Sequence, residues 1–303
     1  MNTQTTGTLS AFILFFILAT PALADSPLAY WSLDEGAGQP RLELINGYHL
    51  TDPNSQVIAI SGYLNRAADF EREASDYLTL TDPQQLNITG DLTLTGWVNI
   101  ESSPQLLYGI FAAKYRFGSN PSRGYRLGMN QSNQLYFVVS DDGGFEADNN
   151  LTGSIAMIPG EWHHVAAVFD GEPTGGTMTL YLDGRLDATK TVSFNSINAS
   201  NAPFMLGANL QDNTIFQHFD GGLDDWRVYD RALSQTEIGL LRAGTGNPST
   251  GLPTGTAHTY TLTSGNLLVI RNEATMGDAV LLGGLLSVLS VSVLTVVILV
   301  VLK

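Results

Sequence analysis

The sequence contains no cysteine among its 303 residues. This absence excludes disulfide bonds and every metal site built on thiolates, so the fold must be held by its own hydrophobic core. Without its two apolar terminal segments, the chain keeps a folded part of about 220 residues, which is enough for one sizeable core.

Basic residues are scarce as well, since 14 Lys and Arg stand against 29 Asp and Glu, which gives a formal net charge of −15. All the acidic residues and 13 of the basic ones lie between Asp25 and Asp278, so this part carries 13 − 29 = −16. Such a charge argues against nucleic acid and anionic lipid surfaces as partners. It suits a site where carboxylates hold a divalent cation.

A long uncharged run lies near each end of the chain. Leu9 to Ala19 is an apolar run too short to span a bilayer, and Ala22 and Ala24 form the small-x-small pattern of signal peptidase sites. We therefore predict a signal peptide over residues 1–24. No Lys or Arg precedes the run, so an uncleaved anchor is the alternative.

The C-terminal run from Ala279 to Leu302 also lacks charge and is followed only by Lys303. At ~1.5 Å per residue, about 20 residues cross a ~30 Å hydrocarbon core. We predict a transmembrane helix over residues 279–302, with Lys303 on the cytoplasmic side. Residues 244–278 are predicted to be a flexible spacer and stalk. The protein would then be extracytoplasmic and anchored in the plasma membrane.

The region 25–243 alternates apolar and polar residues with period two, and turn residues recur about every ten positions, which is typical of antiparallel sheets. Asp183-Gly184 predicts a two-residue hairpin turn. Ser234 and Glu237 have the spacing of a helix capping box. The apolar positions of three such strands are Leu92, Leu94, Val98 and Ile100, then Val165, Ala167 and Phe169, then Met178, Leu180 and Leu182.

Several segments in order resemble one family, the laminin-G-like jelly rolls of the concanavalin A-like lectin and glucanase superfamily that bacteria also carry. The segments are YWSLDEGAG, GYLNRAADFEREASDYLTL, LTLTGWVNI, IPGEWHHVAAVFDG with MTLYLDGRLDA, and FDGGLDDWRVYDRALSQTEIGLL. The resemblance covers about Ala29 to Leu241. It implies an all-β sandwich of two antiparallel sheets, often with calcium near a sheet edge, but it implies no activity.

A calcium site is predicted from two acidic positions. In GGLDDWRVYD, period two places Asp224 on the same inward face as Trp226, where an unpaired carboxylate is costly. Asp34 follows the first strand, and the first and last strands of such jelly rolls commonly pair. Asp34 and Asp224 would therefore converge on Ca²⁺, with Asp220 and Asp69 as outer ligands. The alternative is that both accept backbone N–H groups or pair with arginine.

Enzymes of this superfamily carry a Glu-x-Asp-x-x-Glu strand, and this chain has none. A binding surface is the stronger prediction, because aromatic rings beside planar hydrogen-bonding groups suit glycans. Two segments interpreted as loops supply such residues: Tyr115, Arg116, Phe117, Asn120, Arg123 and Tyr125 in the first, and Gln211, Asp212, Phe216 and Gln217 in the second.

The sequence therefore predicts a non-catalytic, glycan-binding module on the cell surface. A structural component of the envelope that binds another protein is one alternative, and a glycoside-active enzyme is the other.

Overall fold

The computed structural model describes residues 26–81, 84–104, 107–118, 121–144 and 149–244, together with the backbone of four short strands beyond residue 257. The chain divides into two compact units, Met1–Pro248 and Ser249–Lys303. The predicted signal peptide and most of the predicted spacer lie outside the described residues.

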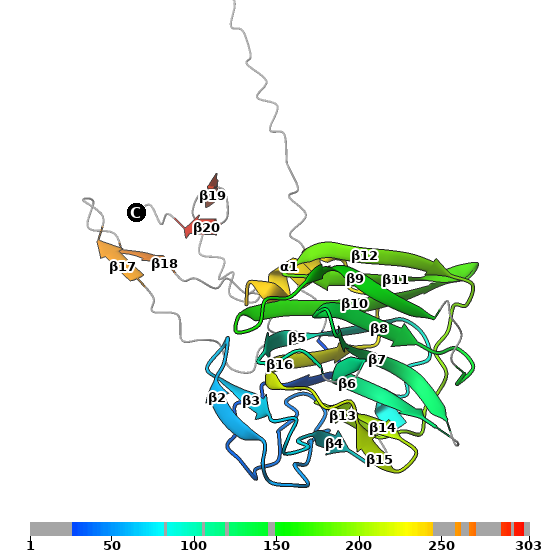
Figure 1. Cartoon of the computed structure of the whole chain (residues 1–303). Coiled ribbons are helices and arrows are strands. Elements are labelled where there is room, and N and C mark those ends of the chain that lie inside the picture. Colours follow the sequence, from blue (N-terminus) through cyan, green and yellow to red (C-terminus); the bar gives the residue numbers. More distant parts are fainter. Residues whose placement is uncertain are drawn as a thin grey trace, which may run out of the picture. The chain divides into compact units, whose positions relative to one another are not determined.

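The first unit contains two sheets of eight strands each (Figure 1). The first sheet has the order β12-β11-β10-β5-β16-β3-β2, and β1 also pairs with β16. Its strands are β1 (Ala29–Trp31), β2 (Ile58–Ser61), β3 (Arg66–Phe70), β5 (Leu92–Ile100), β10 (Trp162–Glu172), β11 (Gly175–Leu182), β12 (Arg185–Val192) and β16 (Gly221–Tyr229).

The second sheet has the order β15-β14-β6-β7-β8-β9, and β13 links β6 to β4. All its pairs are antiparallel except that of β14 with β6, which is parallel. Its strands are β4 (Leu78–Leu80), β6 (Tyr108–Phe117), β7 (Ser122–Asn130), β8 (Gln134–Val139), β9 (Asn150–Ala156), β13 (Phe204–Leu206), β14 (Asn209–Gln211) and β15 (Thr214–Phe216).

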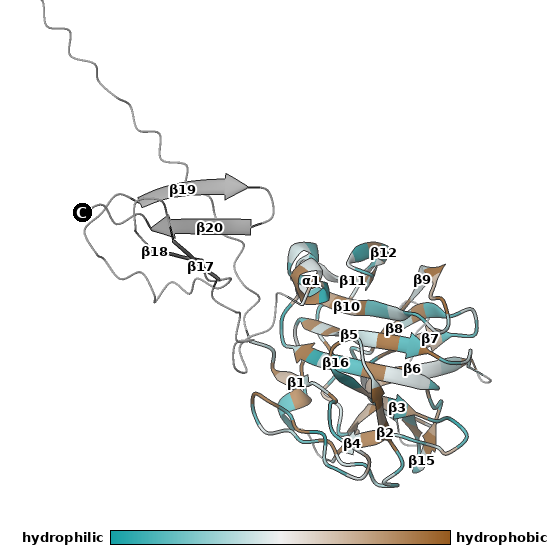
Figure 2. Ribbon diagram, turned by 90° about the vertical axis from the view of Figure 1, so that its left-hand side faces the viewer, coloured by the Kyte–Doolittle hydropathy of each residue, from teal (hydrophilic) through white to brown (hydrophobic). Residues whose placement is uncertain are grey.

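The main core lies between the inner faces of the two sheets. Trp226 of the first sheet and Phe111 of the second are both fully buried there, and their rings meet edge to face at 6.3 Å. Hydrophobic residues recur along the strands of both layers (Figure 2). The predicted two-sheet all-β sandwich is confirmed.

Local predictions hold where the period is unbroken. The apolar positions of β5, β10 and β11 that the alternation selects all belong to this core. Asp183 and Gly184 both have positive φ, 51° and 74°, which a type I′ turn requires. The first and last strands pair as expected, with Trp31 opposite Trp226.

The unit contains one α-helix among its described residues, α1 (Gln235–Arg242), and a 3₁₀ turn, η1 (Gln84–Leu86). The capping box is present, because Ser234 accepts from the Glu237 N–H while the Glu237 carboxylate accepts from the Ser234 N–H. Ile238 and Leu241 of α1 pack on the outer face of the first sheet. Part of that face is thereby removed from solvent.

In the second unit the structure describes two hairpins, β17 (His258–Thr261) with β18 (Leu267–Ile270) and β19 (Leu286–Val291) with β20 (Leu294–Leu299). The structure describes residues 286–291 and 294–299 of the predicted transmembrane helix as strands, and the rest of 279–302 lies outside the described residues. No helix is found in the described part of this run, and the transmembrane helix stays a prediction. Within the part of the chain that is described, no helix is both long and apolar enough to cross a bilayer.

Candidate functional site

A hollow of about 200 Å³ lies on the second sheet and is lined by residues of β6, β7 and the segment after β15. It is smaller than the roughly 300–1,000 Å³ of typical small-molecule pockets, so it suits one ring-sized group. Its lining residues are Tyr115, Phe117, Arg123, Arg126 and Gln217. Four of these five were predicted as ligand residues from the sequence.

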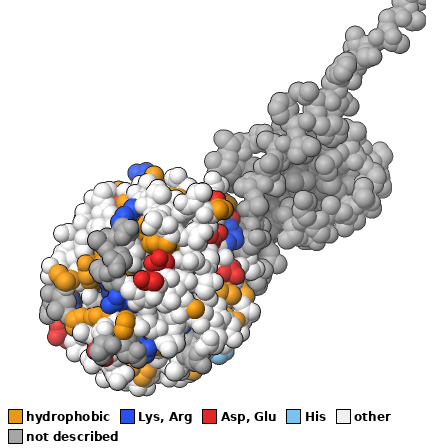
Figure 3. Space-filling view, turned by 90° about the vertical axis from the view of Figure 1, so that its right-hand side faces the viewer, with side chains coloured by type: hydrophobic (Ala, Val, Ile, Leu, Met, Phe, Trp, Pro, Cys, Tyr) orange, Lys and Arg blue, Asp and Glu red, His pale blue; other side chains and the backbone are white. Residues whose placement is uncertain are grey.

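The hollow belongs to the outer face of the sheet, because Tyr115 and Phe117 join a second apolar cluster with Tyr108 and Tyr136. This cluster is separate from the core between the sheets. Tyr108 and Tyr136 stack with their ring centroids 4.1 Å apart. The face is therefore an aromatic platform on strands rather than a set of loops, and Figure 3 shows hydrophobic side chains beside basic ones on one face of the unit.

Arg126 is the residue that the sequence analysis missed. Its guanidinium lies over the rings of Tyr108, Tyr115 and Tyr136, at 5.3, 4.7 and 5.5 Å from their centroids. Its Nη1 donates to Gln217 Oε1 at 3.0 Å. Period two could have found it, since Arg126 follows an inward tyrosine and must face the other way.

The first predicted loop is largely a β-hairpin, because β6 ends at Phe117 and β7 begins at Ser122. Tyr125 is a core residue that is 1 % exposed and donates its hydroxyl to the Leu86 carbonyl, so a ligand cannot reach its ring. Arg116 does not line the hollow, and its Nη2 donates to Asn201 Oδ1. Asn120 lies outside the described residues.

The second predicted segment lies at the margin of the hollow. Phe216 packs against Phe117 with ring centroids 5.7 Å apart. Gln211 pairs with Phe117 across the parallel β14–β6 contact, and Asp212 donates its N–H to the Phe117 carbonyl. Only Gln217 of this segment reaches the lining itself.

The prediction that Asp224 faces the core together with Trp226 is wrong. A register shift lies between Asp224 and Arg227, and Asp225 has a φ of 51° there. Leu223 and Trp226 both face the core as a result, whereas Asp224 pairs with Trp97 on the outer side of β5. A bulge adds one residue to the alternation and so reverses the faces beyond it.

Asp34 and Asp224 both meet the turn between β2 and β3. Asp224 Oδ2 accepts from the Leu64 N–H and Asp34 Oδ1 from the Arg66 N–H, each at 2.9 Å. Asp224 is fully buried, and its Oδ1 has no hydrogen-bond partner. Burial, aided by the negative charges of Asp225 and Asp34, raises the pKa of Asp224 to about 8.

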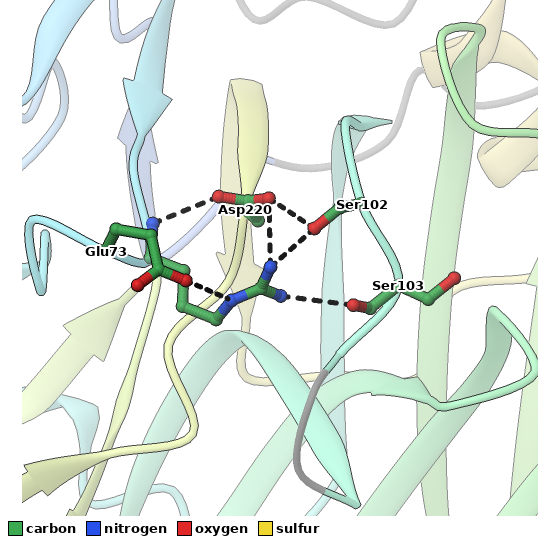
Figure 4. A network of polar contacts seen from close by, with 5 residues as sticks. Glu73, Ser102, Ser103 and Asp220 are labelled. Atoms are coloured by element: carbon green, nitrogen blue, oxygen red, sulfur yellow. Dashed lines mark hydrogen bonds and ion pairs between the residues drawn. The ribbon is translucent and has the colours of Figure 1, made fainter.

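Asp220 and Asp69, the predicted outer ligands, contact other groups than Asp34 and Asp224 do. Asp220 accepts from the Ser102 hydroxyl, from the Arg72 N–H at 3.1 Å and from Arg72 Nη2 at 3.3 Å (Figure 4). Asp69 is 5 % exposed, and burial, with negative neighbours led by Glu101, raises its pKa to about 6.

The four predicted calcium ligands do not gather into one site. Among the described residues, no three acidic, histidine or cysteine side chains are grouped so that they could hold a metal ion. The hydrogen bonds that Asp34 and Asp224 accept from backbone N–H groups match the alternative to calcium binding, in which these carboxylates are hydrogen-bond acceptors. The unpartnered Oδ1 atoms of Asp224 and Asp69 are features that fit a cation, so calcium binding stays a prediction.

Comparison with known proteins gives a match to the family model described as concanavalin A-like lectin/glucanases superfamily, over residues 72–239. No curated protein sequence matches the chain.

Solved structures with the same fold include domain 4 of the extracellular arabinanase AbnA from Geobacillus stearothermophilus, in complex with arabinotriose. It is 19% identical with a TM-score of 0.50, and the match covers 71% of this chain and 98% of that domain. The binding domain of Paraclostridial mosquitocidal protein 1 is 13% identical with a TM-score of 0.55, covering 88% and 66%. The binding domain of botulinum neurotoxin DC, in complex with SialylT, is 14% identical with a TM-score of 0.51, covering 77% and 53%. The chain thus spans about half to two thirds of the toxin domains.

Proposed function

This chain belongs to the concanavalin A-like lectin/glucanase superfamily, and from that premise we propose that it is a non-catalytic glycan-binding module. The observation that carries the proposal is the hollow on the second sheet, where aromatic rings lie beside guanidinium and amide groups. Sugar rings present apolar C–H faces and a rim of hydroxyls, so a ring stacks on an aromatic face while planar groups bond its hydroxyls.

Phe117 is suited to the stacking role because it is partly exposed, whereas Tyr115 beside it is 3 % exposed. Gln217 is held in place, since its Oε1 accepts from Arg126 Nη1 and from Asn209 Nδ2. Its amide nitrogen is the donor that would bond a sugar oxygen. Side chains fixed in this way lose little entropy when a ligand binds.

The arabinanase domain supports this function, because nearly its whole length matches and it was solved with an oligosaccharide. The toxin domains support it less, since this chain matches only part of each. The lining of the hollow supports a role without catalysis. Its described residues include no carboxylate, whereas glycoside cleavage ordinarily requires a pair of them.

The full-length protein is expected to bind a subset of an immobilised glycan array, and Phe117→Ala is expected to weaken that binding about tenfold, or ~1.4 kcal/mol. Tyr63→Ala is the matched control, because Tyr63 is 46 % exposed and stacks on Trp97 of the first sheet, away from the hollow. Affinity is measured by calorimetry and stability by thermal unfolding. Equal losses in both variants would contradict the assignment of the hollow.

Two further outcomes of that experiment would favour the alternatives. Capture of no glycan would leave an envelope component that binds another protein. Release of sugars from a polysaccharide would favour a glycoside-active enzyme.

We also propose that the module is displayed outside the cell and anchored through residues 279–302. Their lack of charge and the small-residue site at Ala24 support this topology. Protease added to intact cells is expected to remove the sandwich and leave a C-terminal fragment in the membrane fraction, and deletion of residues 276–303 is expected to release the protein. A sandwich protected in cells with a permeable wall would overturn the topology.

A further inference from the structure

Arg126 is an almost completely buried cation that pairs with no carboxylate among the described residues. It is 5 % exposed, and none of the five ion pairs among the described residues includes it. Its Nε has no hydrogen-bond partner. Its contacts are the Gln217 amide oxygen and three tyrosine rings, and it also donates a hydrogen bond to the Tyr136 hydroxyl.

These contacts hold the guanidinium in place but do not neutralise it. An arginine stays charged in proteins, and a buried charge is ordinarily matched by an opposite charge. Ring faces and a neutral amide each offset only part of the lost hydration. No described acidic residue supplies the opposite charge, so the missing component is an anion.

Arg123 adds a second cation to the same lining, 5.9 Å from the centroid of the Tyr115 ring. Two guanidinium groups therefore border the hollow, and none of the described residues that line it is acidic. Two guanidinium groups in one lining favour the binding of an anionic group.

We propose that the glycan recognised at this hollow carries an oxyanion, a ring carboxylate or a sulfate, which binds to the Arg126 guanidinium. This inference rests on the proposed glycan-binding function and specifies its ligand class. A planar guanidinium presents two parallel N–H donors to the two oxygens of such a group, which a neutral hydroxyl cannot match. The tyrosine rings that Arg126 lies over hold the plane of its guanidinium fixed before the ligand binds.

The test uses pairs of probes with the same sugar backbone, one charged and one neutral: trigalacturonate with its methyl ester, and sulfated with fully desulfated carrageenan oligosaccharides. The full-length protein is expected to bind the charged member of at least one pair ten times or more tightly than the neutral member. The first pair reports a carboxylate and the second a sulfate, so the two sources are distinguished.

Arg126→Gln is expected to reduce the preference for the charged probe to less than about threefold. Arg126→Lys is expected to keep part of that preference, because lysine retains the positive charge but lacks the two parallel N–H donors. Arg185→Gln is the matched control, since Arg185 is exposed on β12 of the other sheet. The charged and neutral probes are compared in the wild type first, so the result does not depend on the folding of a variant.

The outcomes separate the two proposals. Phe117-dependent binding with no preference for charge would overturn the acidic ligand and leave the glycan-binding module intact. A preference that survives Arg126→Gln would overturn the role of Arg126. Binding of no probe and of no array glycan would overturn both.

Discussion

Between pH 5 and pH 8 in EDTA, the wild-type protein is expected to lose up to about 4 kcal/mol of unfolding free energy through Asp224, and Asp224→Asn is expected to retain it. Burial raises the folded-state pKa of this carboxyl to about 8. Above the unfolded-state pKa of about 4, the unfolded chain has released the proton that the folded protein still binds. Stability is therefore fully present below that value and is lost as the pH rises toward 8.

Asparagine stays neutral at every pH and keeps an oxygen that can accept the Leu64 N–H, so the variant should have the shallower profile. Urea unfolding at pH 5, 6.5 and 8 measures the difference. Asp141→Asn, at an exposed position, is the control and should follow the wild type. Asp69, with its pKa raised to about 6, adds a slope common to all three proteins. If the unfolding free energies of Asp224→Asn and wild type changed in parallel with pH, the raised pKa of Asp224 would be contradicted.

The same measurement decides the calcium prediction. A bound cation favours the ionised carboxylate, so Ca²⁺ at 100 times its Kd would restore about 2.7 kcal/mol to the wild type at pH 8. Mg²⁺ should restore less, because it demands a tighter octahedral shell, and Asp224→Asn should not respond. Identical curves in calcium and in EDTA would discard the metal and leave Asp224 as an acceptor of backbone N–H groups.

Gly96→Ala is expected to destabilise the sandwich by about 3 kcal/mol, because the added Cβ overpacks the core. That Cβ would lie 2.2 Å from Trp226 Cε3 and within 3 Å of two more indole atoms. Trp226 is fully buried and in contact with Phe111, so its ring has no room to move. The melting temperature should fall by about 6–12 °C.

Gly90→Ala is the matched control, because nothing lies within 4 Å of its added Cβ. It is expected to leave stability unchanged or to raise it by up to about 1 kcal/mol. Trp226→Phe should rescue Gly96→Ala in a double-mutant cycle, since the smaller ring leaves room for the methyl group. Additive losses in the cycle would show that the clash lies elsewhere.

The sequence by itself determined the sandwich and its inner faces, because alternation is a local property of an extended chain. The core positions of β5, β10 and β11, the turn at Asp183-Gly184 and the cap at Ser234 follow from residues at most a few positions apart. Four of the five lining residues were also predicted from the sequence, but they were assigned to loops. A run rich in Gly, Ser and Asn between β6 and β7 led to that assignment.

Only the tertiary structure decided which side chains share a site and which way they face. Arg126 and Gln217 meet across 91 positions of the chain, a separation at which no local pattern acts. Asp224 faces outward because Asp225 adopts a positive φ, which a residue other than glycine takes up only when the surrounding packing holds it there. The alternation fixes the faces within an unbroken strand, whereas bulges and long-range pairing assign those faces to the core, to the hollow or to the β2–β3 turn.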